Sequence, residues 1–122
     1  MSFDALFFRE YDHETCNCLH FTVDAWRVLF GIDLSFLTQA YAREGDAVLS
    51  DFLKSKVFER IPHPVSPCLC LLRGLVADQT HIATFLDGRV LHISEVGVQY
   101  LPPEVVFPLY KKVLFYEYRQ NH

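Results

Sequence analysis

The dipeptide Asp87-Gly88, between two stretches rich in apolar and β-branched residues, constrains the fold more than any other feature of the sequence. Such a pair favours the positive φ angles of a two-residue hairpin turn. It therefore predicts strands at Thr80–Leu86 and Arg89–Ser94. Side chains alternate between the faces of paired strands, so this register makes His81 and His92 diagonal neighbours on one face.

Ala83 lies between the two histidines in this register, and its small side chain leaves room for their rings. From the residues alone, the pair has two interpretations: two half-buried histidines, each with a satisfied hydrogen bond, or part of a functional site. If the pair is part of a functional site, Asp78, shortly before His81, either polarises the base or binds a substrate. If the histidines are only structural, Asp78 is an exposed loop residue.

A helical pattern precedes this hairpin. Apolar residues recur at helical spacing over 18–29, with Asn17 as the expected N-cap and Gly31 as the residue that ends the helix. A second helical region is expected over 35–56, interrupted near Gly45. The first ten residues, which include three phenylalanines, could form a short helix or a lid.

Further strands are expected in the second half of the chain. Cys68–Leu72 is expected to be a buried strand, Val96–Tyr100 a short one after the hairpin, and Val113–Tyr118 a last strand rich in aromatic and β-branched residues. Pro62, Pro64 and Pro67 exclude a helix over the stretch that contains them. Pro102, Pro103 and Pro108 mark a connection. Helices that precede an antiparallel sheet define an α+β fold, here a single domain over 1–122.

The composition agrees with this fold and excludes several partners. The 122 residues are 51% hydrophobic, which is enough for a core, and the net charge of −4 argues against a nucleic-acid partner. No segment reaches the roughly 18 apolar residues of a membrane span. The first ten residues do not form a secretory signal, so we expect synthesis in a cytoplasm.

Cys18 is the residue most suited to covalent chemistry. A thiol at a helix start is favoured as thiolate by the helix dipole, and a thiol nucleophile needs a base that a third group orients. Cys18, His81 and His92 supply these three types of group. The alternative interpretation of Cys18 is a small buried hydrophobic residue.

The other cysteines leave one further alternative. Cys16 is expected to be a loop thiol, and Cys68 and Cys70 are expected to lie in the core of a buried strand. A metal site built from these three and Cys18 is less expected, because Cys-x-Cys spacing is looser than that of most zinc sites. The sequence thus predicts no cofactor.

The stretch Asn17-Cys18-Leu19-His20-Phe21 at a helix start, followed by the hairpin from His81 to His92, resembles the NlpC family of papain-like cell-wall peptidases. The resemblance implies a papain-like fold with N-terminal helices on a small antiparallel sheet. It also implies Cys18 as nucleophile, His81 as base and His92 as the group that orients it. His20, Ala83 and Asp78 would then line the substrate groove.

Six residues depart from the family pattern, and two of them, Thr84 and Phe85, suit a strand. Asn17 stands in place of an acidic residue, Leu19-His20 in place of Ser-Gly, and Ala83 in place of a glycine after the base. None of these departures removes a catalytic group. Ala83 narrows the cleft slightly.

A wider pattern from Tyr11 to Trp26, together with Val65–Cys68 and Gly97–Pro103, is similar to the small tail-associated members of this family in phages of Gram-negative bacteria. This likeness implies an endopeptidase at the virion tail tip that cuts peptidoglycan stem peptides in the host periplasm. Its partners would be other tail-tip or baseplate proteins. The alternatives are a tail-tip structural or assembly protein with little activity, and a metal-binding tail component.

Overall fold

The computed structural model describes residues 3–12, 16–38, 57–74 and 80–119. A short 3-10 helix and a longer α-helix come first, and six strands with two short helical turns follow. The predicted α+β class is therefore correct. In chain order the elements are η1 (Phe3–Phe8), α1 (Cys18–Phe30), β1 (Phe58–Ile61), β2 (Cys68–Arg73), β3 (Thr80–Leu86), β4 (Arg89–Ser94), β5 (Gly97–Leu101), α4 (Pro103–Val106), η3 (Phe107–Leu109) and β6 (Lys112–Tyr118).

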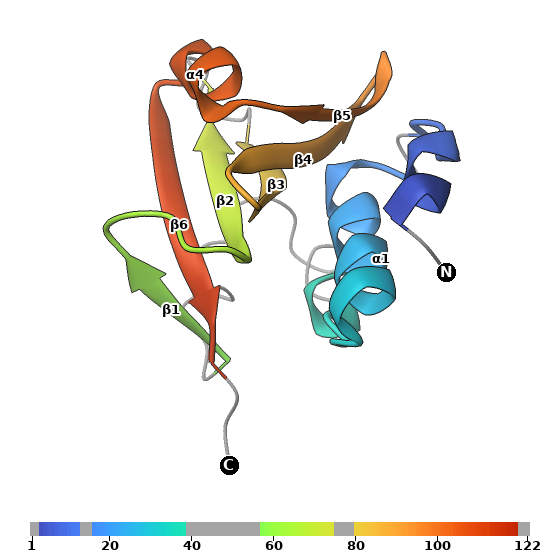
Figure 1. Cartoon of the computed structure of the whole chain (residues 1–122), viewed down its shortest axis with the longest axis horizontal. Helices are drawn as coiled ribbons and strands as arrows, with labels where there is room; N and C mark the ends of the chain where they lie inside the picture. Colours follow the sequence, from blue (N-terminus) through green and yellow to red (C-terminus); the bar gives the residue numbers. More distant parts are fainter. Residues whose placement is uncertain (1–2, 13–15, 39–56, 75–79, 120–122) are drawn as a thin grey trace.

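All six strands join one antiparallel sheet with the order β1-β6-β2-β3-β4-β5. From β2 to β5 each strand pairs with the next one in the chain. β6 instead inserts between β1 and β2, two strands formed much earlier in the sequence. Figure 1 shows the strong twist of this sheet, because β4 and β5 run across the view while β2 and β6 run almost vertically.

The predicted hairpin has the expected bounds and register. Thr84 pairs with Leu91 and Leu86 pairs with Arg89. Asp87 and Gly88 have φ angles of 51° and 80°, which is the left-handed conformation that both central residues of a type I′ turn require. The turn dipeptide thus sets the side-chain alternation of both strands.

The sheet has two apolar faces with different covers. On one face, which we call the α1 face, Ile82, Leu91 and Ile93 pack against α1. The opposite face, the α4 face, carries Ala83 and Val90 and is covered by Val106 of α4 together with its neighbours. Both faces are buried, so the sheet forms the middle layer of the fold.

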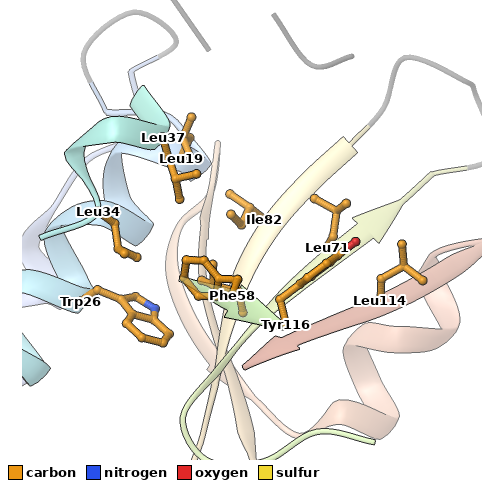
Figure 2. Packing of buried hydrophobic residues seen from close by; sticks show 10 residues of the cluster. Leu19, Trp26, Leu34, Leu37, Phe58, Leu71, Ile82, Leu114 and Tyr116 are labelled. Atoms are coloured by element: carbon orange, nitrogen blue, oxygen red, sulfur yellow. The ribbon is translucent and has the colours of Figure 1, made fainter. Parts of the chain in front are cut away.

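Trp26 is the largest side chain of the core on the α1 face, and none of it is exposed. Its indole Nε1 donates a hydrogen bond of 3.0 Å to the buried Thr84 hydroxyl of β3. Figure 2 shows it beside Leu34 and Phe58, with the strand residues Ile82, Leu71, Tyr116 and Leu114 beyond. This contact fixes the C-terminal half of α1 over the end of β3.

Three local predictions for the helical part can be compared with the structure. The N-terminal segment forms η1, whose Leu6 is buried and whose Phe3 packs on Tyr100 of β5. Gly31 ends α1 in a left-handed conformation with φ 66°, as predicted. The second helical region lies outside the described residues, apart from a helical start at 35–38.

Three elements were not predicted: β1, α4 and the 3-10 turn η3 that follows α4. β1 has four residues and only Phe58 is buried, so its sequence carries no clear alternation. α4 starts at Pro103 in a stretch that we interpreted as a connection only. Proline is well suited to the first position of a helix, where its missing N–H has no partner to lose. Among the helices of the described residues, none has the length and apolar character needed to cross a membrane.

Candidate active site

Cys18 is the first residue of α1, and a reciprocal cap fixes the position of this helix start. The Asn17 side chain accepts hydrogen bonds from the backbone N–H groups of Leu19 (3.0 Å) and His20 (3.1 Å). In return, Nδ1 of His20 accepts one from the N–H of Asn17 (3.3 Å). Asn17 is therefore the N-cap, as predicted, and the two residues form a capping box with histidine in the usual place of Glu or Gln.

This cap gives the His20 ring a structural role. Because its Nδ1 accepts a hydrogen bond, the neutral ring carries its proton on Nε2. The role of His20 in a substrate groove stays a prediction. Because Nδ1 is engaged in the cap, only the Nε2 edge of the ring could contact a substrate.

His81 and His92 are in direct contact, which confirms the predicted common face. His81 Nε2 lies 3.1 Å from His92 Nδ1, and the rings are nearly perpendicular, with an interplanar angle of 85°. Ala83 between them is fully buried, while His92 is 7% exposed. A larger residue at position 83 would compete with both rings for this space.

The contact restricts where the protons of the two rings reside. If His81 is to accept a proton on Nδ1, it must carry its own proton on Nε2 and donate it to His92 Nδ1. His92 then carries its proton on Nε2, a buried nitrogen without a hydrogen-bond partner among the described residues. The pair is thus compatible with a base at His81 Nδ1, oriented by His92.

Both imidazoles are neutral at neutral pH. Burial, and secondly the charge of His92, lowers the pKa of His81 to about 4. Burial also lowers the pKa of His92. A neutral His81 has a free lone pair to accept a proton, and once protonated in this environment it releases the proton readily.

Tyr110 connects the histidine pair with Cys18. Its ring lies parallel to that of His81, with an interplanar angle of 3° and centroids 6.2 Å apart. The pKa of Tyr110 is raised by burial and, secondly, by the negative charge of Cys18. Tyr110 is therefore close to both the base and the thiol. No local sequence pattern marks this tyrosine as a site residue, because it lies in the proline-marked connection.

Tyr11 approaches Cys18 from the N-terminal segment. Its pKa is raised by burial and then by the negative charges of Cys18 and Glu95. Glu95 directly follows β4, two residues beyond the end of the apolar stretch that contains His92. The start of α1 therefore lies near the end of the sheet where β4 finishes.

The site consequently lies at one end of the sheet, where its two faces meet. By alternation His81 and His92 belong to the α4 face, whereas α1 covers the other face. The Lys111 N–H donates to the Arg73 carbonyl (2.8 Å), which places the Tyr110 segment where β3 begins. The structure thus brings Cys18, His81, His92 and Tyr110 to the same end.

The cysteines other than Cys18 take no part in the contact of the two histidines. Cys68 and Cys70 are fully buried, as predicted, and share a thiol hydrogen bond that, with burial, raises the pKa of Cys70. Cys16 is half-buried and none of the four cysteines forms a disulfide. Within the described ranges, no three His, Cys, Asp or Glu side chains converge as metal ligands. Asp78 lies outside the described residues.

Comparisons with known proteins identify no relative of the chain. No family model, no curated protein and no solved structure matches it.

The first testable prediction concerns Tyr110. Replacing Tyr110 by alanine should raise the pKa of His81 from about 4 towards the ordinary value of 6.5, because water reaches the ring and stabilises the imidazolium. Histidine NMR titration measures this shift directly. Tyr110→Phe retains the ring and should leave the His81 pKa nearly unchanged. Equal titration of all three proteins would show that Tyr110 does not shield His81.

Proposed function

We propose that this chain is a cysteine peptidase in which Cys18 is the nucleophile, His81 is the general base and His92 orients His81. The observation that carries the proposal is the contact of His81 Nε2 with His92 Nδ1 at 3.1 Å. This contact engages Nε2 of His81, so in the proposed mechanism Nδ1 is the nitrogen that accepts the thiol proton. Acyl transfer needs this set of a nucleophile, a base and an orienting group.

In the first half of the reaction, the Cys18 thiol proton moves to His81 Nδ1 while Sγ attacks the peptide carbonyl carbon. The C–S bond forms and the carbonyl π electrons move to oxygen, which gives a tetrahedral oxyanion. The N-terminal end of α1, with its positive helix dipole, stabilises negative charge at this position. When the C–N bond breaks, His81 gives its proton to the leaving amine.

The second half hydrolyses the thioester. His81, neutral again, removes a proton from water as the water oxygen attacks the acyl carbon. The C–S bond then breaks and the proton returns to the Cys18 sulfur. The low pKa of buried His81 favours the proton-donating step of each half, to the leaving amine and to the Cys18 sulfur, while it makes the neutral ring a weak base for the proton-accepting steps.

For the particular enzyme, we propose a papain-like fold of the NlpC type and a peptidoglycan stem peptide as substrate. The support is the order and spacing of Asn17-Cys18 at the start of α1 and of His81 and His92 on one hairpin. The similarity of the wider motif supports a place at the tail tip of a phage. There the chain would act in the periplasm of a Gram-negative host, beside other tail-tip or baseplate proteins.

Digestion of purified Gram-negative peptidoglycan tests this function. The wild-type chain, alone and in assembled tail tips, should release stem-peptide fragments with new free amines, which mass spectrometry identifies. Prior alkylation of accessible thiols should stop the release. If neither form releases peptide above the alkylated background, the peptidase proposal is wrong, and a structural role in the tail becomes the better one.

A further inference from the structure

β6 extends beyond β1 at one edge of the sheet. β1 ends at Ile61, which pairs with Phe115, whereas β6 begins three residues earlier at Lys112. Pro62 and Pro64 follow β1 and have no N–H to continue the ladder. On this side of β6, the described part of the chain therefore provides no strand opposite Lys112–Leu114. We call this place the β6 notch.

The backbone of Val113 is directed to the notch. The Arg119 N–H donates to the carbonyl of Val57 just before β1, so Arg119 points to the β1 side. Alternate residues of a strand point the same way, which directs the N–H and C=O of Phe115 and Val113 to that side. Phe115 has Ile61 as a partner, whereas no described strand faces Val113.

A hollow coincides with the notch. It has a volume of about 400 Å³ and is open to solvent. Five of its six lining residues are apolar and the sixth is a cation: Ile61, Pro62, Val113, Leu114, Phe115 and Arg60. A strand added beside β6 would direct every second side chain into this hollow.

Positive charges that have no ion-pair partner among the described residues gather around the notch. Arg60, Arg73, Lys111 and Lys112 are all exposed, and none forms an ion pair within the described residues. Arg73 lies directly opposite Lys112 in the register, an arrangement of like charges that is unfavourable. The whole chain has a net charge of −4, so this concentration of cations is local.

The opposite end of β6 has no such excess. There Arg119 forms ion pairs with Glu59 and with Glu117 (3.0 Å). The difference between the two ends of one strand indicates that the cations at the notch have an external anionic partner.

We propose that the β6 notch binds an acidic, extended segment of a partner protein, which adds to the sheet as a short strand beside Lys112–Leu114. The segment hydrogen-bonds to the Val113 backbone, places apolar side chains in the hollow and directs its carboxylates to Arg60 and Lys112. Strand addition at an exposed edge is an established mode of peptide recognition. This interaction is independent of the proposed peptidase activity.

A defined peptide tests the proposal on the full chain. The probe is an acetylated, amidated hexapeptide of alternating glutamate and valine, titrated into isotope-labelled protein and followed by amide NMR. We expect saturable shifts at Val113 and Phe115, and weaker affinity at higher salt. The same peptide with lysine in place of glutamate should not bind, and an N-methylated version should lose most of its affinity because it cannot pair with the edge.

Matched variants locate the charges. The double variant Arg60→Gln and Lys112→Gln should lower the affinity for the glutamate peptide about tenfold, which is the effect expected from the loss of two exposed ion pairs. Arg119→Gln removes an equally exposed cation at the far end of the sheet and should bind as the wild type does. Binding of the lysine peptide, equal losses in the Arg119 variant, or absence of shifts at Val113 would each overturn the proposal.

Discussion

Replacing Cys18 by alanine is expected to lower peptide release from peptidoglycan by roughly 10³- to 10⁶-fold, the range found when a nucleophile is removed from a catalytic triad. Without Sγ no acyl-enzyme forms, and the His81 base has no proton to accept. The fold should persist, because Cys18 is half-buried and small, and the cap formed by Asn17 and His20 does not use its side chain.

Cys16→Ala is the matched control, since it removes a half-buried thiol two residues away, and the backbone hydrogen bonds of Cys16 to Asp12 do not depend on that thiol. It should retain activity close to that of the wild type. Rates are compared by mass spectrometry of the released peptides. Equal rates for the Cys18 and Cys16 variants would rule out Cys18 as the nucleophile.

The histidine variants should lose activity in a fixed order. His81→Ala should be nearly as damaging as loss of the thiol, because both deprotonation of Cys18 and protonation of the leaving amine fail. His92→Ala should be milder, since the orienting contact to His81 Nε2 can be partly replaced by water. A larger loss for the His92 variant than for the His81 variant would reverse the assignment of base and orienting group.

The largest effect on stability is expected for Trp26→Ala, a loss of about 3–5 kcal/mol in the free energy of unfolding. The substitution leaves a cavity between α1 and the sheet, and it removes the partner of the buried Thr84 hydroxyl. Urea denaturation followed by circular dichroism measures the change. Fluorescence is unsuitable, because Trp26 is the only tryptophan of the chain.

Phe8→Ala is the control for this experiment, because it removes an aromatic ring that is 85% exposed. Its unfolding free energy should differ from that of the wild type by less than about 0.5 kcal/mol. Similar losses in the two variants would mean that Trp26 does not carry the contact between α1 and the sheet.

Local signals predicted much of the fold. The bounds of β3 and β4 follow from alternation around Asp87-Gly88, and both ends of α1 follow from Asn17 and Gly31. These features depend on residues close in sequence, where turn and cap chemistry decide the backbone. The contact of the two histidines then followed from counting along the hairpin.

The rest depends on contacts between distant segments. β1 has little alternation of its own and exists because it pairs with β6. Tyr110 reaches His81 only because the chain turns back through α4 to the end of the sheet. No local sequence pattern predicts that the chain turns back in this way. The role of His20 had a signal, since Asn-x-x-His resembles a capping box, but histidine is an unusual partner there.

The position of β6 between β1 and β2 bears on how the protein is made. On the ribosome, β2 to β5 can pair as soon as they emerge, but β1 has no neighbour until 112–118 are synthesised. Until then β2 exposes an unpaired edge, and such edges favour aggregation. When β6 pairs with β1 and β2, Tyr110 also reaches its place beside His81. The nascent chain therefore carries its thiol and its histidines before Tyr110 stacks on His81, so under the proposed function it would not yet hold the complete site.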